Sequence, residues 1–202
     1  MNTRSIYPPV KRALDVAASA AGLLALAPAL TLIAVAVKAS SPGPVFFSQE
    51  RMGVSGRPFR LFKFRTMVER AAGPLVTSAA DSRITRIGEF LRRYKLDELP
   101  QLVNVLVGDM SLVGPRPEVQ CYAERFPGDY QRILSVRPGI TDFAAIEYRD
   151  EQRILARYPD PERAYLEEVL PAKIKLYHRY LDQMSLRTDF ALIARTLLAV
   201  IR

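Results

Sequence analysis

Residues 92–117 read RRYKLDELPQLVNVLVGDMSLVGPRP, and they place two adjacent carboxylates, Asp97 and Glu98, directly after a basic cluster. Pro100 is tolerated in the first turn of a helix, so a helix is predicted to begin near Asp97 and to end at Gly108. An apolar stripe at helical spacing supports it: Leu99, Leu102, Val103 and Leu106. The acidic pair would then lie at the positive end of the helix dipole.

Two interpretations of this acidic pair are open. Acidic residues often occupy a first helical turn only because they stabilise the dipole. With a divalent cation and flanking arginines, the same pair would instead hold a phosphate group. The rigid loop Gly114-Pro115-Arg116-Pro117 favours the second interpretation, because it fixes one arginine between two prolines shortly after the helix.

The composition limits the kinds of site that the chain can build. The formal charge is +8 and the pI is about 9.8, so an acidic partner is expected: nucleic acid, anionic lipid or a phosphorylated substrate. Cys121 is the only cysteine, which excludes an intrachain disulfide and fits a reducing compartment. His178 is the only histidine, so a Cys/His zinc site is excluded, and no nucleophile motif accompanies it for a Ser-His-Asp triad.

A long apolar stretch occupies residues 13–37 and contains one charge, Asp15. About 20 apolar residues suffice to span a bilayer core. Pro28 lies near the middle, where it kinks or breaks a helix. Basic residues flank both ends, and the positive-inside rule keeps both flanks on the cytoplasmic side. We therefore expect a re-entrant helix that turns at Ala27-Pro28 and leaves by the face it entered; a tilted, kinked transmembrane helix is the alternative.

A β-hairpin is expected after this segment. Residues 59–67 alternate apolar and basic side chains, which is typical of a strand, and Gly56-Arg57-Pro58 suits the turn before it. Lys63 and Arg65 share one side of this strand, where a pair of cations can hold phosphate oxygens. A solvated edge of a basic protein is the other interpretation.

Helical patterns dominate the rest of the chain, at residues 81–92, 150–157, 162–181 and 189–202. The helix expected at residues 81–92 has an apolar stripe bordered by arginines. This pattern fits a helix lying in a membrane interface or a helix packed on a core. Together the patterns predict an α+β fold. Residues 1–40 form the N-terminal segment with the re-entrant membrane helix, and residues 41–202 form a small, mostly helical domain with a short β-hairpin and interfacial amphipathic helices.

A series of motifs between residues 11 and 145 resembles, in the same order, the bacterial sugar transferase family, the small monotopic polyprenyl-phosphate phosphoglycosyl transferases. The motifs are Lys11-Arg12 with Asp15, the Pro28 break, Gln49-Glu50-Arg51 with Gly53, Lys63-Phe64-Arg65-Thr66-Met67, Leu96-Asp97-Glu98-Leu99-Pro100-Gln101, Gly108-Asp109-Met110-Ser111, Gly114-Pro115-Arg116-Pro117 and Arg137-Pro138-Gly139-Ile140-Thr141. The series is far more specific than any one of its members.

The resemblance implies an enzyme of the bacterial inner (cytoplasmic) membrane, with its catalytic domain on the cytoplasmic face. Such enzymes move a sugar 1-phosphate from a UDP-sugar to a polyprenyl phosphate, here expected to be undecaprenyl phosphate, and release UMP. Asp97 would be the nucleophile of a covalent phosphosugar intermediate, Glu98 would assist it, and Mg²⁺ would bridge Asp97 and the diphosphate. The candidate phosphate ligands are Lys63, Arg65, Arg92, Arg116 and Arg137. The implied partners are membrane lipid and downstream glycosyltransferases. The resemblance implies no nucleic-acid partner.

The chain departs from many relatives at two places. Ala27 stands where many have Ser before the proline, and a serine hydroxyl would satisfy a freed backbone carbonyl. Asp142-Phe143-Ala144 stands where many have Gly-Trp-Ala, in a region expected to contact the sugar or the base. The sequence therefore leaves the donor sugar open.

Two other classes of function fit parts of the sequence. A membrane-anchored protein that binds anionic lipid or nucleic acid would account for the +8 charge, but carboxylates among its arginines would weaken phosphate binding. A catalytically silent scaffold that recruits a glycan assembly pathway would not need the intact pair Asp97 and Glu98.

Overall fold

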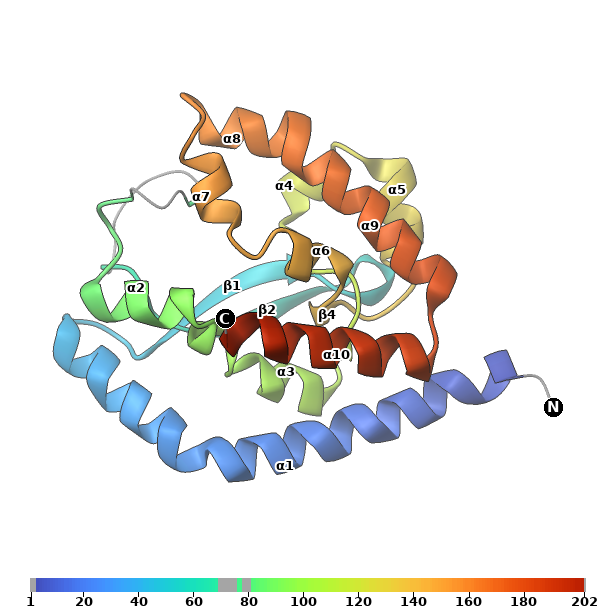
Figure 1. Cartoon of the computed structure of the whole chain (residues 1–202), viewed down its shortest axis with the longest axis horizontal. Helices are drawn as coiled ribbons and strands as arrows, with labels where there is room; N and C mark the ends of the chain where they lie inside the picture. Colours follow the sequence, from blue (N-terminus) through green and yellow to red (C-terminus); the bar gives the residue numbers. More distant parts are fainter. Residues whose placement is uncertain (1–2, 69–75, 78–80, 202) are drawn as a thin grey trace.

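The computed structural model of the chain describes residues 3–68, 76, 77 and 81–201. It mixes helices with two small sheets, as expected for an α+β fold. One long apolar helix, α1 (Thr3–Ser40), runs along one side of a small, mostly helical domain (Figure 1).

The expected break at Ala27-Pro28 is not an interruption, because α1 continues through Pro28 to Ser40. Figure 1 shows instead that α1 is bent in its middle part. Pro28 has no backbone N–H to donate, and the Thr31 hydroxyl donates to the Ala27 carbonyl at 2.9 Å; both features favour bending. Among the described residues α1 is the helix long and apolar enough to cross a membrane, over Tyr7–Ser40 with a mean hydropathy of 2.3.

A group of polar side chains, which we call the anchor cluster, joins the N-terminal part of α1 to α9 (Leu170–Gln183) and α10 (Leu186–Ile201). Its members are Tyr7, Lys11, Tyr180 and Asp189. Asp189 Oδ2 accepts hydrogen bonds from the Tyr7 hydroxyl and from Lys11 Nζ, both at 2.8 Å, and Oδ1 accepts from the Tyr180 hydroxyl at 2.9 Å. Both oxygens of this buried carboxylate are therefore satisfied.

Two further polar residues of α1 hold it against α3 (Gln101–Val107) and β3 (Ser111–Val113). Arg12 donates to the carbonyls of Val105 and Leu106, at 2.6 and 3.0 Å, and so caps the negative end of α3. Buried Asp15 accepts from the backbone N–H of Leu112 at 3.1 Å. Arg12 and Asp15 thus face the domain, whereas many apolar side chains of α1 are exposed.

The predicted hairpin is present. β1 (Phe46–Met52) pairs antiparallel with β2 (Pro58–Phe64) across η1 (Val54–Gly56), in a register that sets Phe47 opposite Lys63. Asn104 of α3 takes the place of a third strand: its Oδ1 accepts from Phe62 N at 3.0 Å, and its Nδ2 donates to the Arg60 carbonyl at 2.7 Å. The hairpin is thereby fixed to α3.

The segment around the acidic pair differs from the prediction at its start. α2 (Arg86–Arg93), capped by the Thr85 hydroxyl, leads into a 3-10 turn, η2 (Leu96–Glu98), and α3 begins only at Gln101. Asp97 and Glu98 therefore lie in the turn before the helix and not in its first turn. Gly108, with a φ of 103°, ends α3 as predicted.

A second sheet, which the sequence did not predict, brings the two Arg-Pro loops together. β3 pairs in parallel with β4 (Gly139–Thr141). The backbones of Gly114 and Gly139 approach so closely that a Cβ on Gly139 would lie 2.1 Å from Gly114 N. Only glycine fits at this contact, and it sets the loop that carries Arg116 beside the loop that carries Arg137.

The remaining helices cover this centre. They are α4 (Gln120–Ala123), α5 (Pro127–Ile133), α6 (Phe143–Glu147), α7 (Glu151–Leu155), α8 (Pro161–Ala164) and the π-helical η3 (Tyr165–Val169). Most of them build the largest hydrophobic core, together with α9. α10 contacts α6, β3 and β4, and it lies on the same side of the domain as α1 and α3 in Figure 1.

Candidate active site

Five charged side chains, which we call the site cluster, meet where η2, β2, α2 and the loop after β3 come together. They are Lys63, Arg92, Asp97, Glu98 and Arg116. Asp97 and Glu98 are only 7 % and 8 % exposed. Buried carboxylates are rare unless they are paired or bind a ligand, so the partners of these two decide what the site can do.

Glu98 is fully paired. Arg116 Nη1 donates to Glu98 Oε2 at 2.9 Å, Arg116 Nη2 donates to the other oxygen, and Lys63 Nζ lies 3.7 Å from Oε1. Burial opposes ionisation of Glu98, but the charges of Arg116 and Lys63 outweigh it and hold the pKa of Glu98 well below its usual range. Burial lowers the pKa of Lys63 to about 8, although Glu98 acts in the opposite direction. Glu98 is therefore a permanent anion that positions two cations.

Asp97 is not paired. Its Oδ1 is buried and has no hydrogen-bond partner among the described residues. Burial, and then the neighbouring charge of Glu98, raise the pKa of Asp97 above its usual value. A buried carboxylate oxygen that no protein group satisfies has a free acceptor site for a cation or a reacting atom.

Arg92 also has a buried polar atom without a hydrogen-bond partner among the described residues. Its Nε donates to the Thr66 hydroxyl at 2.8 Å, whereas Nη1 is buried without a hydrogen-bond partner among the described residues. Burial lowers the pKa of Arg92, and the charge of Asp97 opposes that shift, which indicates that the two groups are close. The site cluster thus contains an unsatisfied donor and an unsatisfied acceptor.

The structure does not bring the other two candidate arginines to this cluster. Buried Arg65 donates to backbone carbonyls at the end of α1, including that of Ser41 at 2.7 Å, because β2 ends at Phe64 and Arg65 leaves the strand. Exposed Arg137 donates through Nε to the Gly108 carbonyl at 2.9 Å, at the end of α3. Each of the two caps the end of a helix.

The expected contact region after Arg137-Pro138-Gly139-Ile140-Thr141 is largely internal. Asp142 is fully buried and caps α6 by accepting from Ala145 N at 2.6 Å. Phe143 is partly buried and lies beneath the Arg179 guanidinium at 4.4 Å. These two side chains therefore support the fold around the site.

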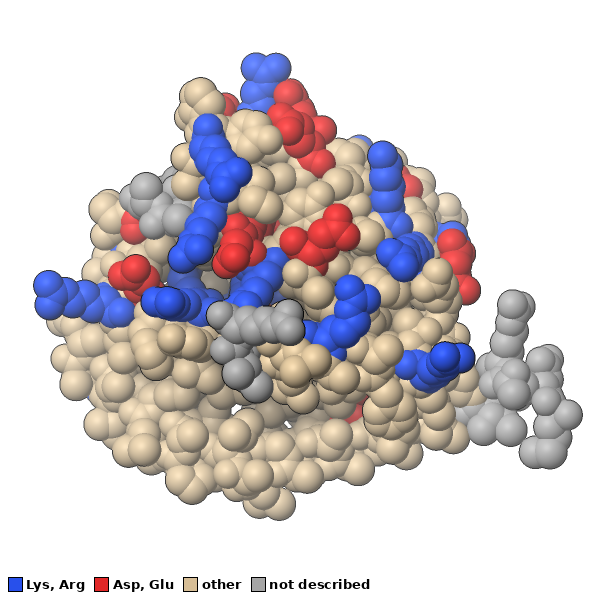
Figure 2. Space-filling view, in the orientation of Figure 1, with Lys and Arg blue, Asp and Glu red and all other residues tan. Residues whose placement is uncertain are grey.

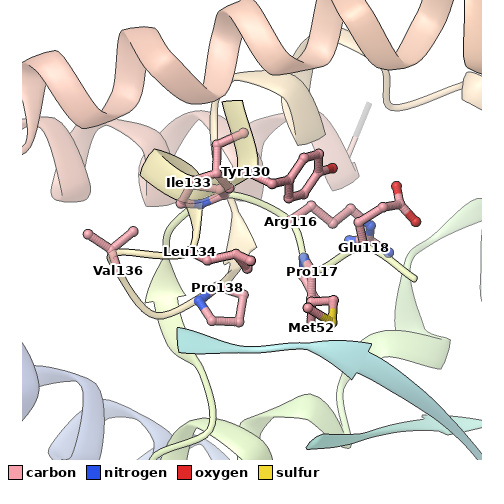
Figure 3. A pocket seen from close by; sticks show the side chains of 10 residues that line it. Met52, Arg116, Pro117, Glu118, Tyr130, Ile133, Leu134, Val136 and Pro138 are labelled. Atoms are coloured by element: carbon pink, nitrogen blue, oxygen red, sulfur yellow. The ribbon is translucent and has the colours of Figure 1, made fainter. Parts of the chain in front are cut away.

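A small pocket lies behind the loop that carries Arg116 (Figure 3). Its walls are mostly apolar, and they come from the end of β1, from α5 and from residues 115–118 and 136–138. Glu118, one of the lining residues, accepts from Arg51 Nη1 at 2.9 Å and from the Tyr165 hydroxyl. The pocket shares Arg116 with the site cluster but is lined by neither Asp97 nor Lys63. It therefore belongs to the packing that supports the loop carrying Arg116.

The surface around the site is basic. Figure 2 shows Lys and Arg side chains, with acidic ones among them, on the face where α2, α7 and the C-terminal end of α10 come together in Figure 1. Such a surface attracts anions. Two groups that support the site were not among the predicted site residues, Thr66 beside Arg92 and Glu118 beside Arg51. Thr66 is itself a member of the motif that contains Lys63, and Glu118 directly follows the motif that contains Arg116, so their positions in the sequence were the available signal.

A metal would find few protein ligands here. Among the described residues, no group of three or more His, Cys, Asp and Glu side chains gathers around a common point. Mg²⁺, however, is often held by one or two carboxylates together with substrate phosphates and water. The unpartnered Oδ1 of Asp97 fits that mode of binding.

Comparison with known proteins gives a consistent picture. The family model described as bacterial sugar transferase matches residues 6–202. A UDP-glucose:undecaprenyl-phosphate glucose-1-phosphate transferase from Escherichia coli (strain K12) is 46% identical over 142 residues, covering 68% of this chain and 31% of the relative. An enzyme of the same name from Caulobacter vibrioides is 49% identical over 142 residues, covering 67% of this chain and 53% of the relative.

A third relative transfers a different sugar. A UDP-N-acetylgalactosamine-undecaprenyl-phosphate N-acetylgalactosaminephosphotransferase from Aeromonas hydrophila is 34% identical over 203 residues, covering 97% of this chain and 44% of the relative. The chain therefore spans between 31% and 53% of the length of these three relatives.

Proposed function

Because this chain belongs to the bacterial sugar transferase family, we propose that it transfers a sugar 1-phosphate from a UDP-sugar to a polyprenyl phosphate. The names of the relatives support UDP-sugars as donors and undecaprenyl phosphate as the acceptor. The single observation that carries the proposal is the unpartnered, buried Oδ1 of Asp97 in a cluster of cations. The donor sugar stays open, because the relatives use both glucose and N-acetylgalactosamine.

The reaction would proceed in two displacements at one phosphorus. In the first, a carboxylate oxygen of Asp97 bonds to the phosphorus that carries the sugar, and the bond to the bridging oxygen breaks. That oxygen keeps the electron pair and leaves with UMP. In the second, a phosphate oxygen of the polyprenyl phosphate bonds to the same phosphorus. The electron pair of the Asp97–phosphorus bond returns to the carboxylate, and polyprenyl diphosphate sugar is released.

The cations of the site cluster would stabilise the charge that gathers on phosphate oxygens in both displacements. Arg116 and Lys63 are held in place by Glu98, and the free Nη1 of Arg92 is available to a phosphate oxygen. Glu98 assists by positioning these cations, since an anion with so low a pKa has no proton to donate. Arg65 and Arg137 support this role least, because both are engaged with helix ends.

Asp97 is also the residue that would hold Mg²⁺, through the oxygen that lacks a protein partner. When bound, the ion neutralises charge on the diphosphate. Asp97 would orient its second oxygen toward phosphorus, and the buried turn around it would limit access of water.

The membrane part of the proposal rests on exposed apolar side chains on α1, α3 and α10. They are Leu24, Leu32, Val35, Val103, Val107, Phe190, Leu197 and Leu198. We propose that α1 enters the bacterial inner membrane and returns to the cytoplasmic face at its bend, with α3 and α10 in the interface. Asp15 and Arg12 support this geometry, because they keep the first part of α1 against the domain. Downstream glycosyltransferases would then meet the product on the same face.

The test is UMP release by the full chain in nanodiscs with Mg²⁺, undecaprenyl phosphate and a panel of UDP-sugars. Release with one donor, dependent on Mg²⁺ and abolished in Asp97→Asn, is the expected result. Release that survives in Asp97→Asn would remove the covalent role of Asp97. No release with any donor would favour a catalytically silent scaffold or anionic-lipid-binding protein, which the +8 charge would also suit.

The topology has a separate test. In a Cys121→Ser background, Thr3→Cys and Ser55→Cys should both react with a membrane-impermeant reagent from the cytoplasmic side. Ser55 lies in the hairpin turn and serves as the reference for the domain. Labelling of position 3 only from outside would overturn the re-entrant geometry.

A further inference from the structure

Lys95 has an unusual backbone conformation directly before the acidic pair. Its φ of 55° and ψ of 20° are left-handed, and among the described residues only Ser55 shares a positive φ without being glycine. A side chain is disfavoured there, because its Cβ crowds the following carbonyl oxygen. Glycine is the usual residue at such a helix end.

The turn itself does not require a lysine. Lys95 N donates to the Arg92 carbonyl at 3.2 Å, and the Lys95 carbonyl accepts from Glu98 N at 3.3 Å. Both bonds use main-chain atoms that glycine would supply equally well. A disfavoured conformation that persists beside a functional site suggests that its side chain is used.

The side chain is an unengaged cation. Lys63, Arg92 and Arg116 each have a protein partner, whereas Lys95 has no ion pair or side-chain hydrogen bond within the described part of the chain. Lys95 is half-buried. Its charge helps to lower the pKa of Glu98 and opposes the upward shift in the pKa of Asp97, so its ammonium lies within electrostatic range of the site. With Lys95 included, the site contains four cationic side chains and two carboxylates, an excess of two positive charges.

We propose that Lys95 binds a phosphate group of a substrate and acts as a fourth cation of the site. The inference rests on the proposed function for the identity of that substrate. A phosphate could come from the sugar nucleotide or from the polyprenyl phosphate, and both present the same anionic oxygens. An ammonium on a flexible stem suits either one.

Substitution by glycine separates the backbone from the side chain. Lys95→Gly relieves the left-handed strain, so the melting temperature should rise by roughly 2–4 °C. The same variant loses the charge, so one substrate KM should rise about tenfold, the effect of one charge-assisted hydrogen bond. Ser55→Gly is the matched control, since it relieves the same strain in the hairpin turn and should raise the melting temperature without changing either KM.

Two more variants test whether the charge is what matters. Lys95→Asn is neutral and tolerates the left-handed region, so it should behave like Lys95→Gly in KM. Lys95→Arg keeps the charge and should stay within about threefold of the wild type, well inside the tenfold loss expected for the neutral variants. Unchanged KM values in Lys95→Gly, or an equal loss in Lys95→Arg, would overturn the proposal.

The source of the phosphate follows from which KM moves. Varying the UDP-sugar at saturating undecaprenyl phosphate, and then the reverse, assigns Lys95 to the donor or to the acceptor. A binding measurement separates this inference from the proposed function. Inorganic pyrophosphate should raise the melting temperature of the wild type more than that of Lys95→Gly. That result would uphold the Lys95 site even if no donor released UMP, and equal shifts would refute it.

Discussion

The anchor cluster and the site cluster are both buried groups of charged and polar side chains, but they differ in how completely they are satisfied. In the anchor cluster, both oxygens of Asp189 accept hydrogen bonds from protein donors. In the site cluster, Asp97 Oδ1 and Arg92 Nη1 have no such partner among the described residues. A satisfied cluster fixes α1 to the domain, whereas an unsatisfied one leaves atoms available to a ligand.

The largest contrast is expected from removing the charge of Asp97. Asp97→Asn should lower the rate of UMP release by about 10⁴-fold or more, as loss of a nucleophile does in other enzymes. Its melting temperature should stay the same or rise, because a buried carboxylate beside Glu98 is replaced by a neutral group. Differential scanning fluorimetry and the UMP assay on the same preparations check both parts. A large fall in stability would make Asp97 a structural residue like Asp189.

The opposite pattern is expected in the anchor cluster. Asp189→Ala removes a buried carboxylate and leaves the largely buried Lys11, whose side chain is 14% exposed, without its partner, which should cost about 3 kcal/mol of unfolding free energy. Activity of the protein that remains folded should change little. Asp182→Ala is the control, since its ion pair with Arg132 is exposed and should contribute less than about 1 kcal/mol. Thermal unfolding in detergent measures both, and equal losses would contradict the distinction.

Asp142 has one satisfied and one unsatisfied carboxylate oxygen. Its Oδ1 accepts a hydrogen bond that caps α6, whereas Oδ2 has no hydrogen-bond partner among the described residues. Burial raises the pKa of Asp142 from 3.8 to about 6. The folded state therefore binds this proton more tightly than the unfolded state. Protonation of Asp142 therefore stabilises the folded state. This contribution to the free energy of unfolding is fully present below about pH 4 and is lost as the pH rises through 6, a change of about 3 kcal/mol.

Asp142→Asn should remove this dependence while keeping the cap. The melting temperature of the variant should exceed that of the wild type at pH 7.5, and the difference should shrink at pH 5. A difference that is the same at both pH values would show that Asp142 ionises normally in the folded protein.

The smallest effect is expected at Arg137. Its side chain is exposed and bonded to the Gly108 carbonyl, so Arg137→Gln should change the donor KM by about twofold at most. Arg116→Gln should be far more damaging, because it leaves Glu98 without its bidentate partner. Steady-state kinetics of the two variants measures this difference. If both variants lost a similar amount of activity, Arg137 would again be a candidate phosphate ligand.

The sequence predicted those features that short-range patterns determine. The hairpin, the end of α3 at Gly108 and the amphipathic helix before the acidic pair all follow from periodicity and turn residues. The motifs singled out the residues of the site cluster as candidates, and the structure places three of the predicted cations, Lys63, Arg92 and Arg116, beside the acidic pair.

Features that depend on distant contacts were missed. The parallel pairing of β3 with β4 joins segments more than twenty residues apart, and neither strand has a pattern of its own. Lys63 and Arg65 lie two residues apart, yet they have unrelated partners because β2 ends between them.

The contacts of Arg65 bear on the order in which the chain folds. Arg65 directly follows the second strand of the hairpin, and its guanidinium donates to the carbonyls of Val37, Ser41 and Pro42, so these contacts close a loop of fewer than thirty residues. Short loops close quickly and early. We therefore expect the end of α1 and the hairpin to assemble while later segments are still leaving the ribosome, so that α1 is already attached to the hairpin when the turn with Asp97 and Glu98 is synthesised.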